Sequence, residues 1–374
     1  MNIGILCYPT YGGSGVMATE LGKALAAKGH KVHFISYNQP VRLDAFSQNT
    51  YYHEVRFNHY PLFKFAPYET ALTSKIVDVV TSHNIEVLHV HYAIPHAAVA
   101  VTAKRILAKN GIKLKIVTTL HGTDITLVGK DKSFEPVVSH SLFESDIVTA
   151  VSNSLKQETY ENFKYDGKIH VIPNFIDFVR FNKQPKDHFK QIIAPNNEKI
   201  IVHTSNFRKV KRVPDVLDVF RKIAQKIPAK MLFIGDGPER NSIEEKCKSC
   251  EICNDVTFLG KQEAVEEILS IADLFIIPSE TESFGLAALE AMACEVPVIS
   301  TNTGGLSEVN IDGVTGFTSD VGDIEKMVND ALYILNDEHL DQFKALAKMH
   351  SLKYKLDTIL PKYEDLYKKS WVTS

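Results

Sequence analysis

The chain has 374 residues, of which 44% are hydrophobic and 23% charged, and its net charge at pH 7 is -3. This length exceeds one common hydrophobic core, so two domains of roughly 150 to 200 residues are expected. The near balance of charges gives no reason to expect a nucleic-acid partner. No stretch approaches the roughly 20 apolar residues of a membrane span, and residues 1–7 lack the pattern of a signal peptide. We therefore expect a cytoplasmic enzyme without stable membrane insertion.

The first half of the chain alternates short apolar segments with helical patterns. Strands are expected at residues 3–7, 31–36, 51–57, 87–92, 115–120, 147–154 and 168–172, and helices at 18–28, 68–83 and 97–110. Ser152 or Asn153 is expected to cap the helix after the sixth strand. Strands that alternate with helices in this way predict a parallel sheet covered by helices.

Polar residues follow several strands of this predicted sheet. Residues 12–15, G-G-S-G, lack the G-x-G-x-x-G spacing of a dinucleotide site, so they are interpreted as a loop whose backbone approaches a ligand. Ligands collect at the carboxyl ends of parallel strands, so this loop, Tyr92 and His121 are predicted to converge on one crevice. His89 and His91 alternate as metal ligands do, but no third ligand is identifiable, which favours a structural or substrate-orienting role.

An aromatic segment and a cysteine cluster each have a structural and a functional interpretation. Residues 59–65 are rich in aromatic side chains and, if exposed, would suit a membrane or a partner subunit, although such runs more often pack on their own domain. Cys247, Cys250 and Cys253 have the spacing of iron–sulfur ligands, but a fourth thiolate is missing. We therefore expect partly exposed thiols near a helix end.

The second half of the chain repeats the alternation. Strands are expected at 200–204, 230–234, 256–259, 271–277 and 296–300, and helices at 214–225, 286–294 and 356–371. The polar stretch 183–199 is the candidate boundary between the domains. Four of the five residues 208–212 are basic and lie at a strand-to-helix turn, which favours an anion site. A solvated basic loop is the alternative.

The segment 276–290, I-I-P-S-E-T-E-S-F-G-L-A-A-L-E, carries the clearest chemical pattern. Backbone amides of residues 283–286 open a predicted helix, where Gly285 permits close approach, and such a terminus attracts phosphate. Carboxylates accept hydrogen bonds from sugar hydroxyls. Glu282, before the helix, and Glu290, inside it, are therefore predicted to face the transferred sugar and a nucleoside ribose.

This segment resembles the paired-glutamate motif, Glu-x7-Glu, of retaining nucleotide-sugar glycosyltransferases of the GT-B architecture. The motifs C-Y-P-T-Y-G-G-S-G-V, H-V-H-Y-A-I-P-H-A, T-T-L-H-G-T-D-I-T and S-N-F-R-K-V-K-R resemble the N-acetylglucosaminyl-malate synthase family of bacillithiol biosynthesis. The resemblance implies an α/β protein with two Rossmann-like domains facing a central cleft. Residues 1–178 would form the acceptor-binding domain, onto which a helix at about 356–374 packs back, and residues 179–355 the nucleotide-sugar domain.

The resemblance further implies transfer of N-acetylglucosamine from UDP-N-acetylglucosamine to the hydroxyl of L-malate with retention, the first step of bacillithiol biosynthesis. The residues implied in catalysis are Arg208, Lys211, Glu282 and His121; in donor binding, Gly13, Gly15, Asn206, Lys261, Ser283, Phe284, Gly285, Leu286 and Glu290; and in acceptor binding, Ser14, Tyr92, Thr119 and Asn153. No D-x-D pair is found, so no cofactor or metal is expected.

Three alternatives remain open at this point. One is a glycosyltransferase of the same fold with another acceptor, such as an inositol phosphate, a lipid-linked sugar or a polysaccharide. Another is a UDP-sugar epimerase, and a third is a non-catalytic nucleotide-sugar sensor. The family resemblance also makes a homo-oligomer plausible.

Overall fold

The computed structural model describes residues 1–10, 12–44, 46–57, 66–128, 131–250 and 252–369. The aromatic segment 59–65 lies outside these residues. The chain forms two compact units. Unit 1 comprises Met1–Phe175 and Leu356–Ser374, and unit 2 comprises Ile176–Lys355.

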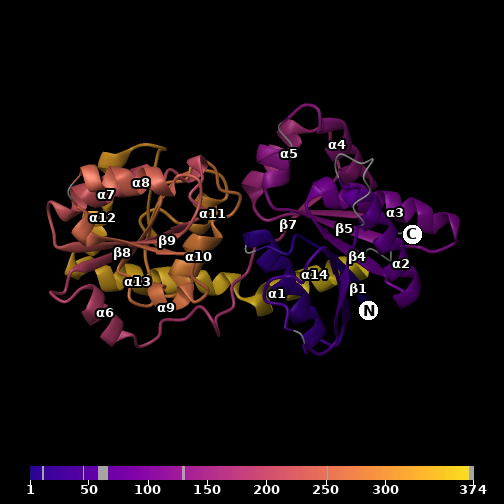
Figure 1. The fold of residues 1–374 in the computed structure, drawn as a ribbon, viewed down its shortest axis with the longest axis horizontal. Helices are drawn as coiled ribbons and strands as arrows, with labels where there is room; N and C mark the ends of the chain where they lie inside the picture. Colours follow the sequence, from indigo (N-terminus) through magenta and orange to yellow (C-terminus); the bar gives the residue numbers. More distant parts are fainter. Residues whose placement is uncertain (11, 45, 58–65, 129–130, 251, 370–374) are drawn as a thin grey trace. The chain divides into compact units, whose positions relative to one another are not determined.

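Unit 1 is built on a seven-stranded sheet in the order β3-β2-β1-β4-β5-β6-β7, and all of its strand pairs are parallel. Its strands are β1 (Asn2–Leu6), β2 (Lys31–Ser36), β3 (Thr50–Glu54), β4 (Val87–His91), β5 (Lys115–Leu120), β6 (Ile147–Ala150) and β7 (Ile169–Val171). Its helices are α1 (Gly13–Ala27), α2 (Tyr68–His83), α3 (Ala98–Lys109), α4 (Glu135–Glu144), α5 (Asn153–Asn162) and α14 (Leu356–Lys369). Figure 1 follows this succession of strand and helix along the chain.

The first helix begins earlier than the sequence pattern indicates. We expected a glycine loop at residues 12–15 and a helix from residue 18, but α1 starts at Gly13. A Cβ atom at Gly15 would lie 2.5 Å from the Tyr8 carbonyl oxygen and 2.6 Å from the Thr10 carbonyl oxygen. Gly15 therefore lets the first turn of α1 pack directly on the backbone of the preceding loop.

Unit 2 contains a six-stranded sheet in the order β10-β9-β8-β11-β12-β13, again with parallel pairs. Its strands are β8 (Lys199–Ser205), β9 (Ala229–Gly235), β10 (Val256–Gly260), β11 (Leu274–Ile277), β12 (Val298–Thr301) and β13 (Gly316–Ser319). Its helices are α6 (Asp187–Ile193), α7 (Val213–Ala224), α8 (Arg240–Ser249), α9 (Val265–Leu269), α10 (Leu286–Ala293), α11 (Leu306–Val309), α12 (Ile324–Leu335) and α13 (Asp337–Ser351).

Two segments of unit 2 differ from the expectation. The stretch 183–199, expected to be a polar boundary, contains α6. The strand expected at 271–277 begins only at Leu274. Asp273, just before it, accepts a hydrogen bond from the Ile200 amide at 3.0 Å through its side chain, while its own amide donates to the Ile200 carbonyl at 2.8 Å.

Both sheets are buried between helices, which accounts for the near-continuous apolar runs of their strands. In unit 2 the apolar face of α7, with Val216 and Phe220, packs on the same core as Phe233 of β9. Among the described residues, no helix combines the length and the apolar character that crossing a bilayer requires.

Candidate functional site

The loop that follows β11 leads directly into α10. Gly285 precedes this helix with a φ of 94°, in the left-handed region that favours glycine. A Cβ atom there would also lie 2.6 Å from Cδ1 of Leu306. The first backbone amides of α10 have no partner within the helix and lie at the positive end of its dipole. This end of the helix is therefore suited to an anion.

Glu282 of the same loop forms a partly buried ion pair with Lys211 of the basic loop after β8. Lys211 Nζ lies 2.5 Å from Glu282 Oε1, and the two side chains are 20% and 13% exposed. The Ser279 hydroxyl donates a second hydrogen bond to the same carboxylate oxygen at 3.0 Å. The predicted cation of the basic loop and the predicted sugar-binding carboxylate are thus brought together.

Two glycines of the next loop support this arrangement. The Gly305 amide donates to the Glu282 carbonyl at 2.8 Å. A Cβ atom at Gly304 would lie 2.1 Å from the Glu282 carbonyl oxygen, and one at Gly305 would lie 2.3 Å from that of Ser283. The backbone at Glu282 and Ser283 therefore packs against Gly304 and Gly305 more closely than any residue with a Cβ atom would allow.

The basic residues after β8 divide into different environments. Arg212 is held by Asp215 at 2.6 Å and by Glu280 at 2.9 Å. Arg208 and Lys209 are exposed. Arg212 is thus already neutralised, whereas Arg208, next along the chain to the fully buried Phe207, remains available to a ligand in solution.

The other predicted donor residues differ in exposure. Asn206 and Lys261 are exposed, and Ser283, Leu286 and Glu290 are partly buried. Phe284 is buried and makes an edge-to-face contact with Tyr354, with 5.7 Å between ring centroids. Phe284 thus packs inside unit 2 and supports the loop through its side chain.

In unit 1 two of the predicted acceptor residues, Ser14 on α1 and Tyr92 after β4, are in contact. The hydroxyls of Ser14 and Tyr92 are 2.6 Å apart. Tyr92 has a φ of 93°, which is rare for a residue other than glycine, and its amide donates to the Thr119 carbonyl at 2.9 Å. The ring of His121 is tilted against that of Tyr92, with 5.4 Å between centroids, and it stacks on His91, with which it shares a 2.8 Å hydrogen bond.

A buried polar network lies beneath the carboxyl ends of β4 and β5. His89 contacts the Tyr367 hydroxyl of α14 through Nδ1 at 2.7 Å and the Thr119 hydroxyl through Nε2 at 2.6 Å. Thr119 continues the network to Thr149 at 2.7 Å and is 0% exposed. In this conformation Thr119 has no exposed atom for an acceptor. His89 thus uses both ring nitrogens within this network, whereas His91 shares its hydrogen bond with His121.

His89 and His121, near the carboxyl ends of β4 and β5, are neutral at pH 7 because their pKa values are lowered. Burial, and then the neighbouring His96, lowers the pKa of His121 to about 3. Asn153, by contrast, is exposed at the start of α5, which Ser152 caps by accepting a 3.0 Å hydrogen bond from the Leu155 amide. The expected cap is therefore confirmed at Ser152.

The sequence interpretation missed Asp124. Its carboxylate accepts hydrogen bonds from the Ala93 amide at 2.8 Å and the Gly122 amide at 3.1 Å, so it joins the loops after β4 and β5. Burial raises its pKa to about 6 although these amides lower it. The motif H-G-T-D contains the residue, but its two amide partners are known only from the fold.

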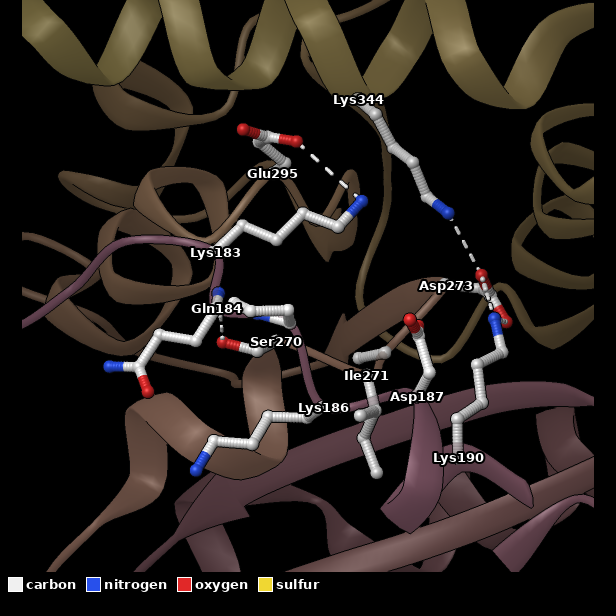
Figure 2. A pocket seen from close by; sticks show the side chains of 12 residues that line it. Lys183, Gln184, Lys186, Asp187, Lys190, Ser270, Ile271, Asp273, Glu295 and Lys344 are labelled. Atoms are coloured by element: carbon white, nitrogen blue, oxygen red, sulfur yellow. Dashed lines mark hydrogen bonds and ion pairs between the residues drawn. The ribbon is translucent and has the colours of Figure 1, made fainter.

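A pocket of about 380 Å³ lies in unit 2 beside residues 270–273, which precede the amino end of β11. Figure 2 shows its lysines pointing toward carboxylates: Lys344 and Lys190 toward Asp273 at 2.8 and 3.2 Å, and Lys183 toward Glu295 at 3.6 Å. Asp273 precedes β11 whereas Glu282 follows it, so this pocket is separate from the anion site. Three of its lysines are thus paired with carboxylates of the same pocket.

The three clustered cysteines lie at the end of α8, as expected. Cys247 is buried, Cys250 is partly buried and Cys253 is exposed. The Sγ atoms of Cys247 and Cys253 are 3.3 Å apart. In the described part of the chain these thiols do not form a group of three metal ligands.

Two parallel-sheet units, each covered by helices, are the GT-B architecture, and the chain also matches glycosyltransferase family models. Residues 184–351 match the model of the glycosyl transferases group 1, and residues 11–180 match that of glycosyltransferase family 4. The chain is 46% identical over 370 residues to the N-acetyl-alpha-D-glucosaminyl L-malate synthase of Bacillus anthracis, covering 98% of this chain and 96% of that relative. The chain belongs to the glycosyltransferase family of that relative.

Two more distant proteins complete the comparison. The D-inositol 3-phosphate glycosyltransferase of Mycolicibacterium smegmatis is 28% identical over 209 residues, covering 53% of this chain and 47% of that protein. The Anabaena protein HepE, solved in complex with UDP and glucose, shares 19% identity with a TM-score of 0.83 and covers 98% of this chain and 99% of its own. At that identity the likeness shows the fold alone.

Proposed function

We propose that this glycosyltransferase moves N-acetylglucosamine from UDP-N-acetylglucosamine to the hydroxyl of L-malate, with retention at the anomeric carbon. The observation that carries the proposal is the 46% identity to the N-acetyl-alpha-D-glucosaminyl L-malate synthase along almost the whole of both chains. The ion pair of Lys211 and Glu282 beside the amino end of α10 supports it, because a nucleotide sugar needs both a cation and a hydroxyl acceptor.

The donor diphosphate would bind in unit 2. Lys211 and Arg208 supply full positive charges, and the free amides at the start of α10 supply partial ones. Glu282 would accept hydrogen bonds from the hydroxyls of the sugar, and Glu290 from those of the ribose. In this proposal the diphosphate competes with Glu282 for Lys211, which the carboxylate holds at 2.5 Å in the free protein.

The chemistry would be a displacement on the face from which the phosphate leaves. The bond between the anomeric carbon and the phosphate oxygen breaks, and a bond to the malate oxygen forms on the same face. The malate hydroxyl gives its proton to the departing phosphate, whose negative charge Lys211 and Arg208 stabilise. These residues would do the work of a metal ion, so we propose a metal-independent reaction.

The acceptor would bind in unit 1. The hydroxyls of Ser14 and Tyr92, 2.6 Å apart, can donate hydrogen bonds to a carboxylate of malate. Asn153, the first residue of α5, is exposed and offers a side-chain amide. His121 is neutral because its pKa is lowered to about 3 by burial. It would therefore orient the sugar through a hydrogen bond and would not act as a cationic acid.

The second candidate function is the same reaction with another acceptor. The relative from Mycolicibacterium smegmatis is named for an inositol phosphate acceptor and matches only about half of this chain at 28% identity. Relatives of this kind show that the acceptor changes within the fold. L-malate is favoured because the Bacillus anthracis relative matches the full chain.

The proposal is tested by measuring UDP release from UDP-N-acetylglucosamine with and without L-malate, in the presence of a chelator, with the product identified by mass. Malate-dependent release together with a malate glycoside supports the proposal and its metal independence. Release without malate would instead indicate hydrolysis or epimerisation, and binding without turnover would indicate a sensor. A cytoplasmic location and a homo-oligomeric state remain predictions, the second to be checked by sedimentation.

A further inference from the structure

Three histidines that the glycosyl transfer does not use converge at one edge of the unit 1 sheet. His33 lies on β2, His53 lies on the edge strand β3, and His83 is the last residue of α2. One ring nitrogen of each lies within 4.8 Å of those of the other two. No other group of three metal-ligating side chains this close occurs among the described residues.

The fold explains why these distant residues meet. In the parallel register of β2 and β3, His33 pairs with Tyr51 and Ile35 pairs with His53. Side chains two residues apart share a face of a sheet, so His33 and His53 project from the same face. The carbonyl of His83 accepts a 2.9 Å hydrogen bond from Asn2 Nδ2 of β1, which holds the end of α2 at the amino edge of this sheet.

The rings are arranged as ligands. His33 Nδ1 and His53 Nε2 are 2.9 Å apart and share one hydrogen bond. The ring of His83 lies 4.6 Å from that of His33 and 4.9 Å from that of His53. Around a tetrahedral Zn²⁺ with bonds of about 2.0 Å, ligand nitrogens are roughly 3.3 Å apart. The three ligand atoms already lie within 4.8 Å of one another, which is close to that spacing.

We propose that His33, His53 and His83 bind one divalent transition-metal ion, with Zn²⁺ as the expected occupant and a water in the fourth position. Imidazole suits zinc, whereas calcium and magnesium prefer oxygen ligands. His83 is exposed and His53 partly so, which gives the ion a route of entry. His33 is buried and stacks on Tyr51 at 4.6 Å, which fixes its ring.

The charges around the cluster permit a cation. Metal binding needs neutral imidazoles, and histidine with an ordinary pKa near 6.5 is mostly neutral at pH 7. The lysine beside His53, Lys75, is held by Asp78 at 3.0 Å, so its charge is compensated. Lys31 opposes binding at His33.

A bound ion would act on stability and not on transfer. It would tie the edge strand β3 to β2 and to α2, none of which contributes a candidate acceptor residue. A ligand that binds only the folded state raises the midpoint of unfolding. We therefore expect Zn²⁺ to raise the thermal midpoint while the transferase activity is unchanged by a chelator.

The test uses the full chain stripped of metal, in a Cys253→Ser background that removes the exposed thiol. Zn²⁺ binding is measured by calorimetry, and Co²⁺ is used as a spectroscopic probe of four-coordinate geometry. His83→Ala and His53→Gln each remove one ligand. His188→Ala, an exposed histidine on α6 in unit 2, is the matched control.

The proposal expects one Zn²⁺ per chain, a visible Co²⁺ band, and a loss of affinity of at least about tenfold in each ligand variant but not in the control. His83→Ala is expected to remain folded because its side chain is exposed. The proposal is overturned if the background protein binds no Zn²⁺ in the micromolar range. It is equally overturned if both ligand variants bind Zn²⁺ as the control does.

Discussion

Lys211 is the residue on which the proposed reaction depends most. It lies in a short turn with Lys209, but only Lys211 is held against Glu282. Lys211→Ala is expected to lower kcat by about 10²- to 10³-fold, because a preorganised donor to the leaving group is lost. Steady-state kinetics with both substrates measures the effect.

Lys209→Ala is the control for this substitution, since Lys209 is exposed in the same turn. It removes an equal charge but is expected to leave kcat within about twofold. Equal losses in the two variants would mean that the loop acts only through its total charge. Near-normal turnover of Lys211→Ala would remove this residue from the mechanism.

At the scale of single elements, the start of α1 depends on one glycine. A Cβ atom at Gly15 would lie 2.5 Å from a backbone oxygen, whereas the nearest atom to a Cβ at Gly12 is at 3.5 Å. Gly15→Ala is therefore expected to destabilise unit 1 by about 1–3 kcal/mol through overpacking, and Gly12→Ala by less than about 1 kcal/mol. Urea unfolding of both variants measures the difference, and equal stabilities would contradict the close contact.

The C-terminal helix α14 is anchored by a buried hydroxyl. Tyr367→Phe removes the partner of His89 Nδ1 and leaves this buried nitrogen without its 2.7 Å hydrogen bond. A loss of about 1–3 kcal/mol is expected. Tyr333→Phe on α12 provides the comparison, because Tyr333 is an exposed tyrosine. A thermal midpoint of Tyr367→Phe equal to that of the comparison would show that the hydroxyl contributes nothing.

The boundaries of elements show what sequence patterns can and cannot predict. Residues 68–83 were predicted as a helix and form α2, because its apolar spacing is a local property. The start of α1 was missed because glycine lowers helix propensity, and the need for glycine at residue 15 is seen only in its contacts with the backbone of Tyr8 and Thr10.

The candidate site divides in the same way. The motif around Glu282 could be predicted from the sequence because its residues are contiguous. The ion pair of Glu282 with Lys211 is known only from the fold. The roles of Asp124 and of the three clustered histidines were not visible, since their partners come from separate segments of the sheet. Such convergence depends on strand order, and periodicity does not specify that order.

The whole molecule contains several buried histidines that share one response to pH. Burial lowers the pKa to about 3 for His89 and His121 and to about 4 for His96 and His203. Unfolded histidine titrates near 6.5. Between about pH 6.5 and 4 the unfolded chain thus binds more protons than the folded chain, so stability falls as the pH is lowered through this window.

Asp124 opposes this trend, because its folded pKa of about 6 lies above that of an unfolded carboxyl. One carboxyl does not outweigh four rings. The apparent thermal midpoint is therefore expected to fall by at least about 5 °C from pH 7 to pH 5, as measured by circular dichroism. An unchanged or higher midpoint at pH 5 would contradict neutral, buried rings.

The pairing of Lys211 with Glu282 also bears on how the reaction ends. A diphosphate that takes Lys211 leaves Glu282 without its cation, and only a ligand that also carries sugar hydroxyls compensates that carboxylate. UDP lacks the sugar, so its binding carries this cost while the intact donor avoids it. If the proposed reaction is correct, we therefore expect weak inhibition of the free enzyme by UDP. Glu282→Gln is expected to bind UDP several-fold more tightly than the wild-type protein while losing turnover, and calorimetry with UDP alone measures this.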